Sequence, residues 1–433
     1  MSDSARMRTV WHPTRAFAAA IIVGLLLLGV AVVASRPDIG CFGVPLVLWA
    51  ALRWQGRPRS PGESGIRISA ENPDRTHGGL TVPFTLRVDA AEPARLAQLR
   101  VRTGGVEDHE LMLSARHELS LRGRMPALHS GPVTVAEAQL RLFTADGAFF
   151  TAPSEPVAVG CTIPPVVRPL SRLLLPARLQ GLSGSHESAR PGDGGEFRDI
   201  HPFAPGDRLR RVDWKATARL SRRPGDLYVR RTSALSDASI VLVMDSGTDV
   251  GEVVAEWPDG DPRLTGTLSL DLAREAAASL ATAYVENGDQ VAFHDLSLGA
   301  PHVRRGSGAR HLARLRAAIA ATRAHGTSWL RRRAPVLPTG ALVYVISPFL
   351  DDEAGRLAGM WRASGHRVIA IDVLPEPVRD RLTREQATAH RILMLERGDR
   401  LGALEAVGVE LLRWGSDAEV EASLLALSRR RRA

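Results

Sequence analysis

The chain has 433 residues, 44% of them hydrophobic and only 5% aromatic, so we expect more than one domain, with cores built mainly from Leu, Val, Ile and Ala. The formal net charge is +9, but Lys215 is the only lysine, the arginines are scattered among carboxylates, and no zinc-finger or RNA-binding motif accompanies them, which argues against nucleic-acid binding. Two cysteines, Cys41 and Cys161, exclude a disulfide framework and fit reducing surroundings.

Two uncharged stretches near the N-terminus, 16–34 and 39–52, are separated by a short polar break. The first is long enough to cross a bilayer as a helix, while the shorter second one leaves open whether it spans fully or re-enters. Arginines flank both outer ends of the pair, which predicts a transmembrane hairpin over 1–54 with both chain ends in the cytoplasm. The lipid bilayer is therefore an expected partner, and the predicted location is the cell membrane, as a multi-pass protein.

A secretory signal peptide is the competing interpretation, because basic residues also precede its apolar core. Here the apolar core is longer than usual and a second apolar segment follows at once. The apolar segments end at Leu52, so a truncated protein that begins near Gly65 is expected to remain soluble and monodisperse.

Beyond a linker rich in Pro, Gly and Arg, apolar and polar residues alternate, which is typical of half-buried strands. The alternating runs lie at 84–88, 99–102, 119–121, 140–143 and 149–151. Ala145-Asp146-Gly147 is a suitable hairpin turn between the last two. The spacing predicts a small antiparallel β-sandwich over about 62–165, interpreted as an interaction or spacer module because it holds no nucleophile beside a base and no metal-ligand spacing.

Strand and helix patterns alternate through the last part of the chain, 237–433. Near-continuous apolar runs predict buried strands at 240–244, 291–293, 342–346, 368–373 and 409–414. Helical spacing over 268–280 and 311–322, and a capping-box pattern from Ser416 to Glu419, place helices between and after them. The pattern predicts a doubly wound, mainly parallel α/β (Rossmann-type) sheet. Ligands of such sheets bind beyond the carboxyl ends of the strands, where Asp245 falls.

A segment between the two modules, 180–236, contains a dense charged motif from Gly192 to Arg219. Its ordered pieces are Gly195–Asp199 (GEFRD), Pro205–Asp207 (PGD), Arg210 and Asp213–Arg219 (DWKATAR). They resemble the signature of the domain-of-unknown-function 58 family, although Phe203 stands where the family often has tyrosine. The resemblance implies a layout of membrane hairpin, β module, signature and von Willebrand A-like domain. It also implies a partner, a MoxR-type AAA ATPase, in assembling or remodelling other proteins.

Two interpretations of the signature remain open. It is either a charged surface that binds a partner or a phosphate-bearing ligand, or a buried ion-pair network that braces the β module against the α/β domain. Asp213 and Trp214 are expected to have the structural role. The candidate partner-binding residues are Glu196, Asp199, Gly206, Asp207, Arg208, Arg210, Arg211, Asp213, Trp214, Lys215 and Arg219.

Local spacing within the signature separates these roles further. Leu209, Val212 and Ala216 have the spacing of one helix face. Arg208 and Arg211 lie off that face, so they are expected to be exposed and to contact a partner. No residue here is a nucleophile with a neighbouring base, which argues against covalent catalysis.

Von Willebrand A-type domains often bind a divalent cation through Asp-x-Ser-x-Ser after the first strand, and oxygen ligands of this kind suit magnesium. This chain has Asp245-Ser246-Gly247-Thr248-Asp249 at that place. Gly247 lacks a side-chain oxygen and Asp249 replaces the second serine. The sequence therefore predicts a degenerate metal site of Asp245 and Asp249, with no cofactor and with a divalent cation only in an altered geometry.

The leading functional interpretation is a membrane-anchored, non-enzymatic interaction or assembly protein that acts with a MoxR-type AAA ATPase. One alternative is a hydrolase or transferase that uses the signature carboxylates. Another is a cation-dependent adhesion protein, which requires the α/β domain to lie outside the cell. No catalytic residue is assigned.

Overall fold

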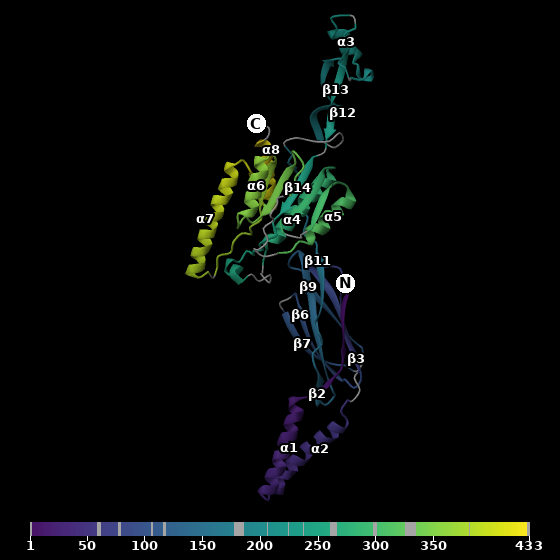
Figure 1. The fold of residues 1–433 in the computed structure, drawn as a ribbon, viewed down its shortest axis with the longest axis vertical. Helices are drawn as coiled ribbons and strands as arrows, with labels where there is room; N and C mark the ends of the chain where they lie inside the picture. Colours follow the sequence, from purple (N-terminus) through teal and green to yellow (C-terminus); the bar gives the residue numbers. More distant parts are fainter. Residues whose placement is uncertain are drawn as a thin grey trace. The chain divides into compact units, whose positions relative to one another are not determined.

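The computed structural model describes residues 2–58, 62–76, 79–104, 107–115, 118–176, 186–205, 207–223, 225–236, 238–259, 266–297, 301–324, 335–380 and 382–430. The chain forms two compact units, coloured along the sequence in Figure 1. The first consists of Met1–Leu128 and Pro132–Ile163, and the second of His129–Gly131 and Pro164–Ala433. The chain is therefore a multi-domain protein, as its composition predicts.

Two sheets with antiparallel strand pairs build most of the first unit (Figure 1). One sheet holds β1 (Ser2–Arg8), β3 (Glu63–Ala70), β4 (Asp74–Thr76), β5 (Gly79–Asp89) and β8 (Leu119–Pro126). The other holds β2 (Trp11–Pro13), β6 (Leu96–Thr103), β7 (Glu107–Ser114), β9 (Gly131–Phe143), β10 (Phe149–Thr151) and β11 (Val157–Ile163). Alternate side chains of both sheets, such as Ile66, Leu86 and Leu99, share one buried core. The predicted alternating runs all lie in these strands.

The strands β1 and β2 correct the predicted boundary of the first segment, 1–54. β1 pairs with β3 over its full length, from Ser2 opposite Ser69 to Arg8 opposite Glu63. β2 pairs with β10. Residues 2–13 thus belong to the β-sandwich and precede the apolar helices in sequence. The alternation in β1 is hard to read because only Ala5 and Met7 turn towards the core.

Two helices, α1 (Arg15–Val33) and α2 (Pro37–Gln55), follow the two predicted apolar stretches. Thr14 caps α1 by accepting a hydrogen bond from the backbone N–H of Phe17 (3.2 Å), and Pro37 begins α2. The helices pack closely where Gly24 meets Gly43, because a Cβ added to Gly43 would lie 2.9 Å from the carbonyl oxygen of Gly24. Within the described part of the chain, α1 is the one helix long and apolar enough to cross a membrane, judged by length and composition.

The base of this helix pair is fixed to the sandwich at the β9–β10 turn. Phe17 and Ala50 pack with Ala148 and Phe149 in a separate buried cluster. The hydroxyl of Thr14 donates a hydrogen bond to the carbonyl oxygen of Gly147 (2.9 Å). Helices and sandwich are therefore parts of one unit.

A six-stranded sheet forms the centre of the second unit. Its order is β16 (His302–Gly306), β15 (Gln290–Asp295), β14 (Ser239–Met244), β17 (Leu342–Ser347), β18 (Arg367–Asp372) and β19 (Glu410–Arg413). The strands run parallel except for β16, which is antiparallel at one edge. The predicted mainly parallel sheet is thus observed, with an unpredicted edge strand.

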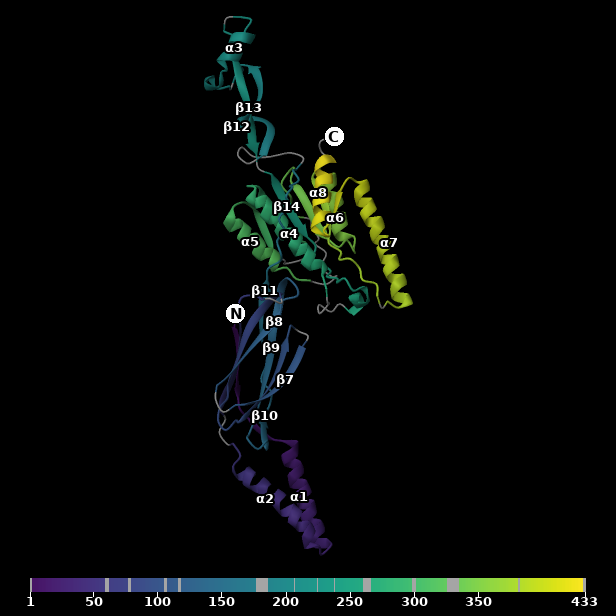
Figure 2. The ribbon, with the colours of Figure 1, turned by 180° about the vertical axis from the view of Figure 1, so that it is seen from behind.

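Helices cover both faces of this sheet (Figure 2). One face is covered by α4 (Ser269–Glu286), α5 (Ala309–Ala320) and α8 (Asp417–Arg430), the other by α6 (Glu353–Ala363) and α7 (Arg384–Ala406). The buried strand β14 serves both cores, because Leu242 packs into one cluster and Val243 into the other. This arrangement explains why the strand is a continuous apolar run.

Candidate functional site

The family signature lies on an arm that precedes the first strand of the six-stranded sheet. β12 (His186–Pro202) and β13 (Tyr228–Ser236) form a separate two-stranded antiparallel sheet. Between them lie the 3₁₀ turn η1 (Leu209–Arg211) and the short helix α3 (Trp214–Leu220), of which α3 is labelled near β13 in Figure 1. We call residues 199–230 the signature arm.

The signature arm has a small core of its own. Val212, Ala216 and Val229 are buried. The backbone N–H of Asp213 donates to the carbonyl oxygen of Tyr228 (2.8 Å), and the N–H of Tyr228 donates to the hydroxyl of Thr217 (2.9 Å). One bond joins two backbone groups and the other joins a backbone N–H to the Thr217 side chain, so α3 is held against β13.

Carboxylates of the arm bind backbone amides. Asp213 caps α3, since its Oδ1 accepts from the N–H of Ala216 (2.9 Å). Asp226 accepts from the N–H of Arg223 (3.0 Å), and Asp207 accepts from the N–H of Ala204 (2.9 Å). Asp213 therefore has the structural role expected of it. It fulfils that role as a helix cap, outside the expected ion-pair network.

The large apolar side chains of the arm are exposed, which corrects two expectations. Leu209 is 68% exposed, so it does not share a buried helix face with Val212. Trp214 is 70% exposed, so it does not have the buried structural role that was expected of it. Leu220, at the end of α3, is 48% exposed. The 3₁₀ turn ends before Asp213 starts α3, and this break in the helix turns Leu209 outwards.

Basic side chains surround these apolar ones. Arg210, Lys215, Arg219, Arg222 and Arg223 are exposed, and none has an ion-pair partner among the residues that the structure describes. Arg208 is exposed and Arg211 half-buried, and both interact with other residues.

Three other candidates of the signature are Asp199, Glu196 and Gly206. Asp199 is half-buried in β12. The Glu196 side chain and Gly206 lie outside the described residues.

The predicted cation residues have separate roles at the carboxyl edge of the six-stranded sheet. Asp245 follows β14; its Oδ1 accepts from the N–H of Gly247 (3.0 Å) and its Oδ2 from the hydroxyl of Ser347 (2.7 Å). Burial raises the pKa of Asp245 to about 6, and the nearby Asp351 and Asp295 act in the same direction.

Asp249 serves the start of α4. Its Oδ1 accepts from the hydroxyl of Ser269 and from the N–H of Leu270, both at 3.0 Å. Burial also raises its pKa. Within the part of the chain that is described, no group of three His, Cys, Asp or Glu residues is placed to hold a metal ion. The degenerate cation site stays a prediction, with Asp249 directed to the helix start.

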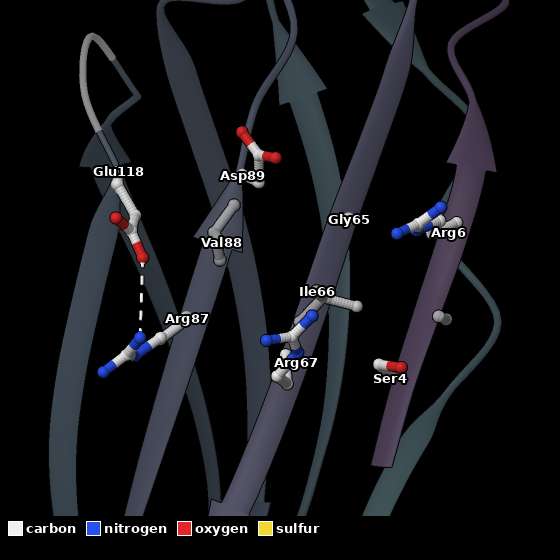
Figure 3. Close-up of a pocket in the computed structure, with 10 residues that line it drawn as sticks. Ser4, Arg6, Gly65, Ile66, Arg67, Arg87, Val88, Asp89 and Glu118 are labelled. Atoms are coloured by element: carbon white, nitrogen blue, oxygen red, sulfur yellow. Dashed lines mark ion pairs between the residues drawn. The ribbon is translucent and has the colours of Figure 1, made fainter. Parts of the chain in front are cut away.

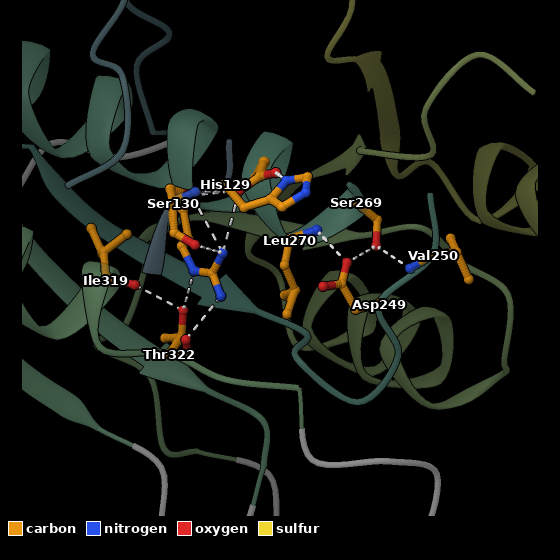
Figure 4. Close-up of polar contacts among 10 residues, drawn as sticks. His129, Ser130, Asp249, Val250, Ser269, Leu270, Ile319 and Thr322 are labelled. Atoms are coloured by element: carbon orange, nitrogen blue, oxygen red, sulfur yellow. Dashed lines mark hydrogen bonds and ion pairs between the residues drawn. The ribbon is translucent and has the colours of Figure 1, made fainter. Parts of the chain in front are cut away.

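A further polar cluster was not signalled by the sequence (Figure 4). Asp271 of α4 contacts His129 (Nδ1–Oδ2, 2.7 Å) and accepts from the Ser130 hydroxyl (2.7 Å). Arg274 donates to the carbonyl oxygens of Ser130 and Thr322, both at 2.9 Å. Burial alone raises the pKa of Asp271, but hydrogen bonds from His129 and Ser130 outweigh it and lower the pKa. Ser130 bonds to the carboxylate and not to the imidazole, so the cluster is no catalytic triad.

An open cavity of about 370 Å³ lies on the outer face of the β1–β3–β5 sheet (Figure 3). Arg67 and Arg87 are directly opposite each other in neighbouring strands. Carboxylates share the cavity, and Glu118 lies 3.9 Å from Arg87. The lining is of mixed charge and contains no nucleophile beside a base, so it does not resemble a catalytic site.

Fold and signature together define an α/β protein whose central sheet is preceded by a two-stranded, signature-bearing arm. Residues 199–382 match the family described as protein of unknown function DUF58. This part of the chain belongs to that family, and the resemblance carried by the signature is confirmed. No curated protein matches the chain. The family description assigns no activity, so function has to be argued from the residues.

Proposed function

We propose that the chain is a membrane-anchored, non-enzymatic interaction protein that acts with a MoxR-type AAA ATPase, and that its α/β domain is von Willebrand A-like. The observation that carries the proposal is the signature arm, a compact element with exposed Trp214 and Leu209 whose Arg210, Lys215 and Arg219 have no ion-pair partner among the described residues. Exposed large apolar side chains with arginine neighbours are typical of interaction surfaces. The parallel sheet with Asp245 beyond its first strand supports the domain type.

Membrane anchoring is supported by the helix pair. Apolar side chains of α1 such as Leu26 and Val33 are exposed, and only 11% of its most apolar window is buried. β1 precedes α1, β3 follows α2, and the two strands are hydrogen-bonded to each other. Both ends of the helix pair must then lie on one side of a bilayer, so α1 cannot cross unless α2 returns.

The charge distribution orients this hairpin. Three arginines, Arg15, Arg53 and Arg57, lie at the end nearest the sandwich, and one, Arg36, lies between the helices. Arg53 pairs with Asp146 (2.7 Å) and Arg36 with Asp38 (2.9 Å), so the difference between the two ends is in the number of arginines. An excess of arginine marks the cytoplasmic side of short membrane segments. We therefore place the sandwich and the α/β domain in the cytoplasm.

The two alternatives have less support. A hydrolase or transferase would need signature carboxylates free for chemistry, but Asp213 and Asp226 bind backbone amides. A cation-dependent adhesion protein would need Asp249 at a metal, but Asp249 binds the start of α4.

The test uses the full chain in detergent micelles, immobilised through a C-terminal tag. A MoxR-type ATPase from the same source is passed over it with ATP, ADP or no nucleotide. We expect retention in at least one nucleotide state. Absence of retention in all three would remove the ATPase from the proposal. Membrane anchoring is tested separately: the protein should stay in the membrane pellet after carbonate extraction, and release into the supernatant would contradict it.

A further inference from the structure

We infer that the signature arm docks on an acidic protein surface that surrounds an apolar pocket, with Trp214 and Leu209 entering the pocket and Lys215 pairing with a carboxylate of the partner. The inference rests on the proposed interaction role and specifies the chemistry of the partner. Three properties of the arm support this inference. Its apolar side chains are exposed on a fixed backbone, several of its cations have no ion-pair partner among the described residues, and carboxylates of the arm accept hydrogen bonds from backbone amides.

The apolar anchors come from separate parts of a fixed structure. Leu209 lies in η1, Trp214 begins α3 and Leu220 ends it. Backbone hydrogen bonds from Asp213 and Tyr228 hold both elements against β13, so little conformational entropy is lost when these side chains enter a pocket. Tryptophan in such a setting is the residue type most enriched among binding hot spots.

The positive charge of the arm determines the sign of the charge that the partner's surface must have. Residues 199–230 contain eight basic and four acidic side chains, an excess of four positive charges. Asp213 and Asp226 accept hydrogen bonds from backbone N–H groups, and neither forms an ion pair with an arginine among the residues that the structure describes. Within the described part of the chain, Arg210, Lys215 and Arg219 have no ion-pair partner, and they lie close in sequence to the exposed Trp214. A complementary surface must therefore present carboxylates.

A protein partner fits the shape better than a membrane does. Amphipathic membrane-binding helices are long and expose one continuous apolar face. α3 has only 7 residues, and its buried Ala216 faces β13. The exposed apolar side chains lie in a 3₁₀ turn and at the two ends of a short helix, and separate anchors of this kind suit a pocket with an acidic rim.

The only lysine of the chain makes a direct test available. A carbodiimide joins an amine to a carboxylate without a spacer, so it couples Lys215 only to an Asp or Glu in contact with it. Native membranes that contain the full-length protein are treated with the reagent. We expect an intermolecular conjugate in the unsubstituted protein that is lost with Lys215→Arg, which keeps the charge but removes the reactive amine. Conjugates that persist in this variant come from the N-terminal amine or from carboxylates of this chain joined to partner amines, and they serve as the background.

Matched variants distinguish a specific contact of Trp214 with the partner from a general effect of removing an exposed side chain. Trp214→Ala should reduce the conjugate by at least about tenfold. Leu395→Ala, which removes a 65% exposed leucine from α7, should leave the conjugate unchanged. So should Arg304→Ala, an exposed arginine in β16. Equal yields from the Trp214 and Leu395 variants would overturn the inference.

Each result bears on a different statement. A conjugate of the mass of the ATPase supports both proposals. A Trp214-dependent conjugate with another protein supports the acidic docking surface and removes the ATPase. Absence of any Lys215-dependent conjugate overturns the docking surface, even where the ATPase is retained in the separate binding test.

A membrane surface is examined with the purified full chain in lipid nanodiscs. An amine-reactive dye labels Lys215, with Lys215→Arg as the background. Equal labelling in neutral and anionic lipid is expected. Protection by anionic lipid alone would replace the protein partner with the membrane.

Discussion

Asp245 and Asp249 illustrate how two carboxylates four residues apart come to serve different parts of a fold. Asp245 is held by Gly247 and Ser347 at the sheet edge, and Asp249 by Ser269 and Leu270 at the start of α4. The sequence shows both residues but not this division, because it depends on which neighbouring N–H groups need an acceptor. Burial then raises the pKa of Asp245 to about 6, so this carboxyl takes up a proton at a higher pH than an exposed aspartate does.

The raised pKa of Asp245 predicts that Asp245→Asn increases the free energy of unfolding, by an amount that depends on pH. The folded-state pKa is about 6 against an ordinary 3.8, so the contribution of this carboxyl to stability is present below about pH 4 and lost as the pH rises through 6. The variant should equal the unsubstituted protein at pH 4 and exceed it by up to about 3 kcal/mol at pH 8.

The measurement is thermal unfolding of the full chain in detergent at both pH values, with EDTA present. Repeating it with magnesium should leave the midpoints unchanged. An Asp245→Asn variant less stable than the parent at pH 8, or a magnesium shift lost in that variant, would show that the carboxylate holds a cation.

Gly131 is required beside Arg274. Its φ of +95° is a conformation that residues with a side chain rarely adopt, and an added Cβ would lie 2.6 Å from the guanidinium carbon of Arg274. Gly131→Ala should therefore destabilise the second unit by more than the about 1–3 kcal/mol of backbone strain alone. Gly308→Ala is the control, because φ is +84° there and a Cβ meets nothing within 4 Å. Equal midpoints for the two variants in thermal melts would refute a specific role of Arg274.

At the scale of elements, sequence patterns correctly located the strands that are buried along their whole length. The strands around 240–244 and 342–346 are apolar throughout because both faces of the sheet are covered. α7 gave no such signal, since only His390 and Leu404 are buried in it. The helical spacing of Leu209, Val212 and Ala216 was misleading. A new helix begins after the N-cap Asp213, so Leu209 and Val212 do not belong to the helix that contains Ala216. Sequence patterns report burial and, as at Ser416 and Glu419, local caps, whereas the partner of a strand depends on tertiary structure.

The pairing of β1 changes the expectation for a truncated protein that begins near Gly65. Such a protein lacks β1 and β2, and leaves β3 as an unpaired edge with the core side chains Ala5 and Met7 removed. We expect it to aggregate. A variant in which residues 15–55 are replaced by a short Gly-Ser linker keeps both strands and should be monodisperse. Light scattering with size-exclusion chromatography compares the two, and a monodisperse Gly65 protein would show that β1 is dispensable.

At the scale of the whole molecule, the β1–β3 pair predicts the topology of the chain in a membrane. A reporter at the C-terminus and one inserted after Ser35, between α1 and α2, should lie on opposite sides of the bilayer, with the C-terminal one in the cytoplasm. Alkaline phosphatase and a fluorescent protein active only in the cytoplasm are placed at each position in turn. Phosphatase activity at the C-terminus would reverse the orientation, and cytoplasmic fluorescence at both positions would exclude a crossing.

The same strand pair has a consequence for biosynthesis. β1 leaves the ribosome before α1, but its partner β3 is made only after α2. In a membrane-anchored chain, β1 must therefore wait as an unpaired strand until both helices have inserted and the chain has come back across the bilayer. If the second helix of a nascent chain failed to cross back through the bilayer, β3 would remain on the opposite side from β1. β1 would then stay unpaired and accessible to proteases and chaperones. In a chain with the proposed membrane topology, completion of the sandwich would act as a check on correct insertion, because only a correctly inserted chain could close its first sheet.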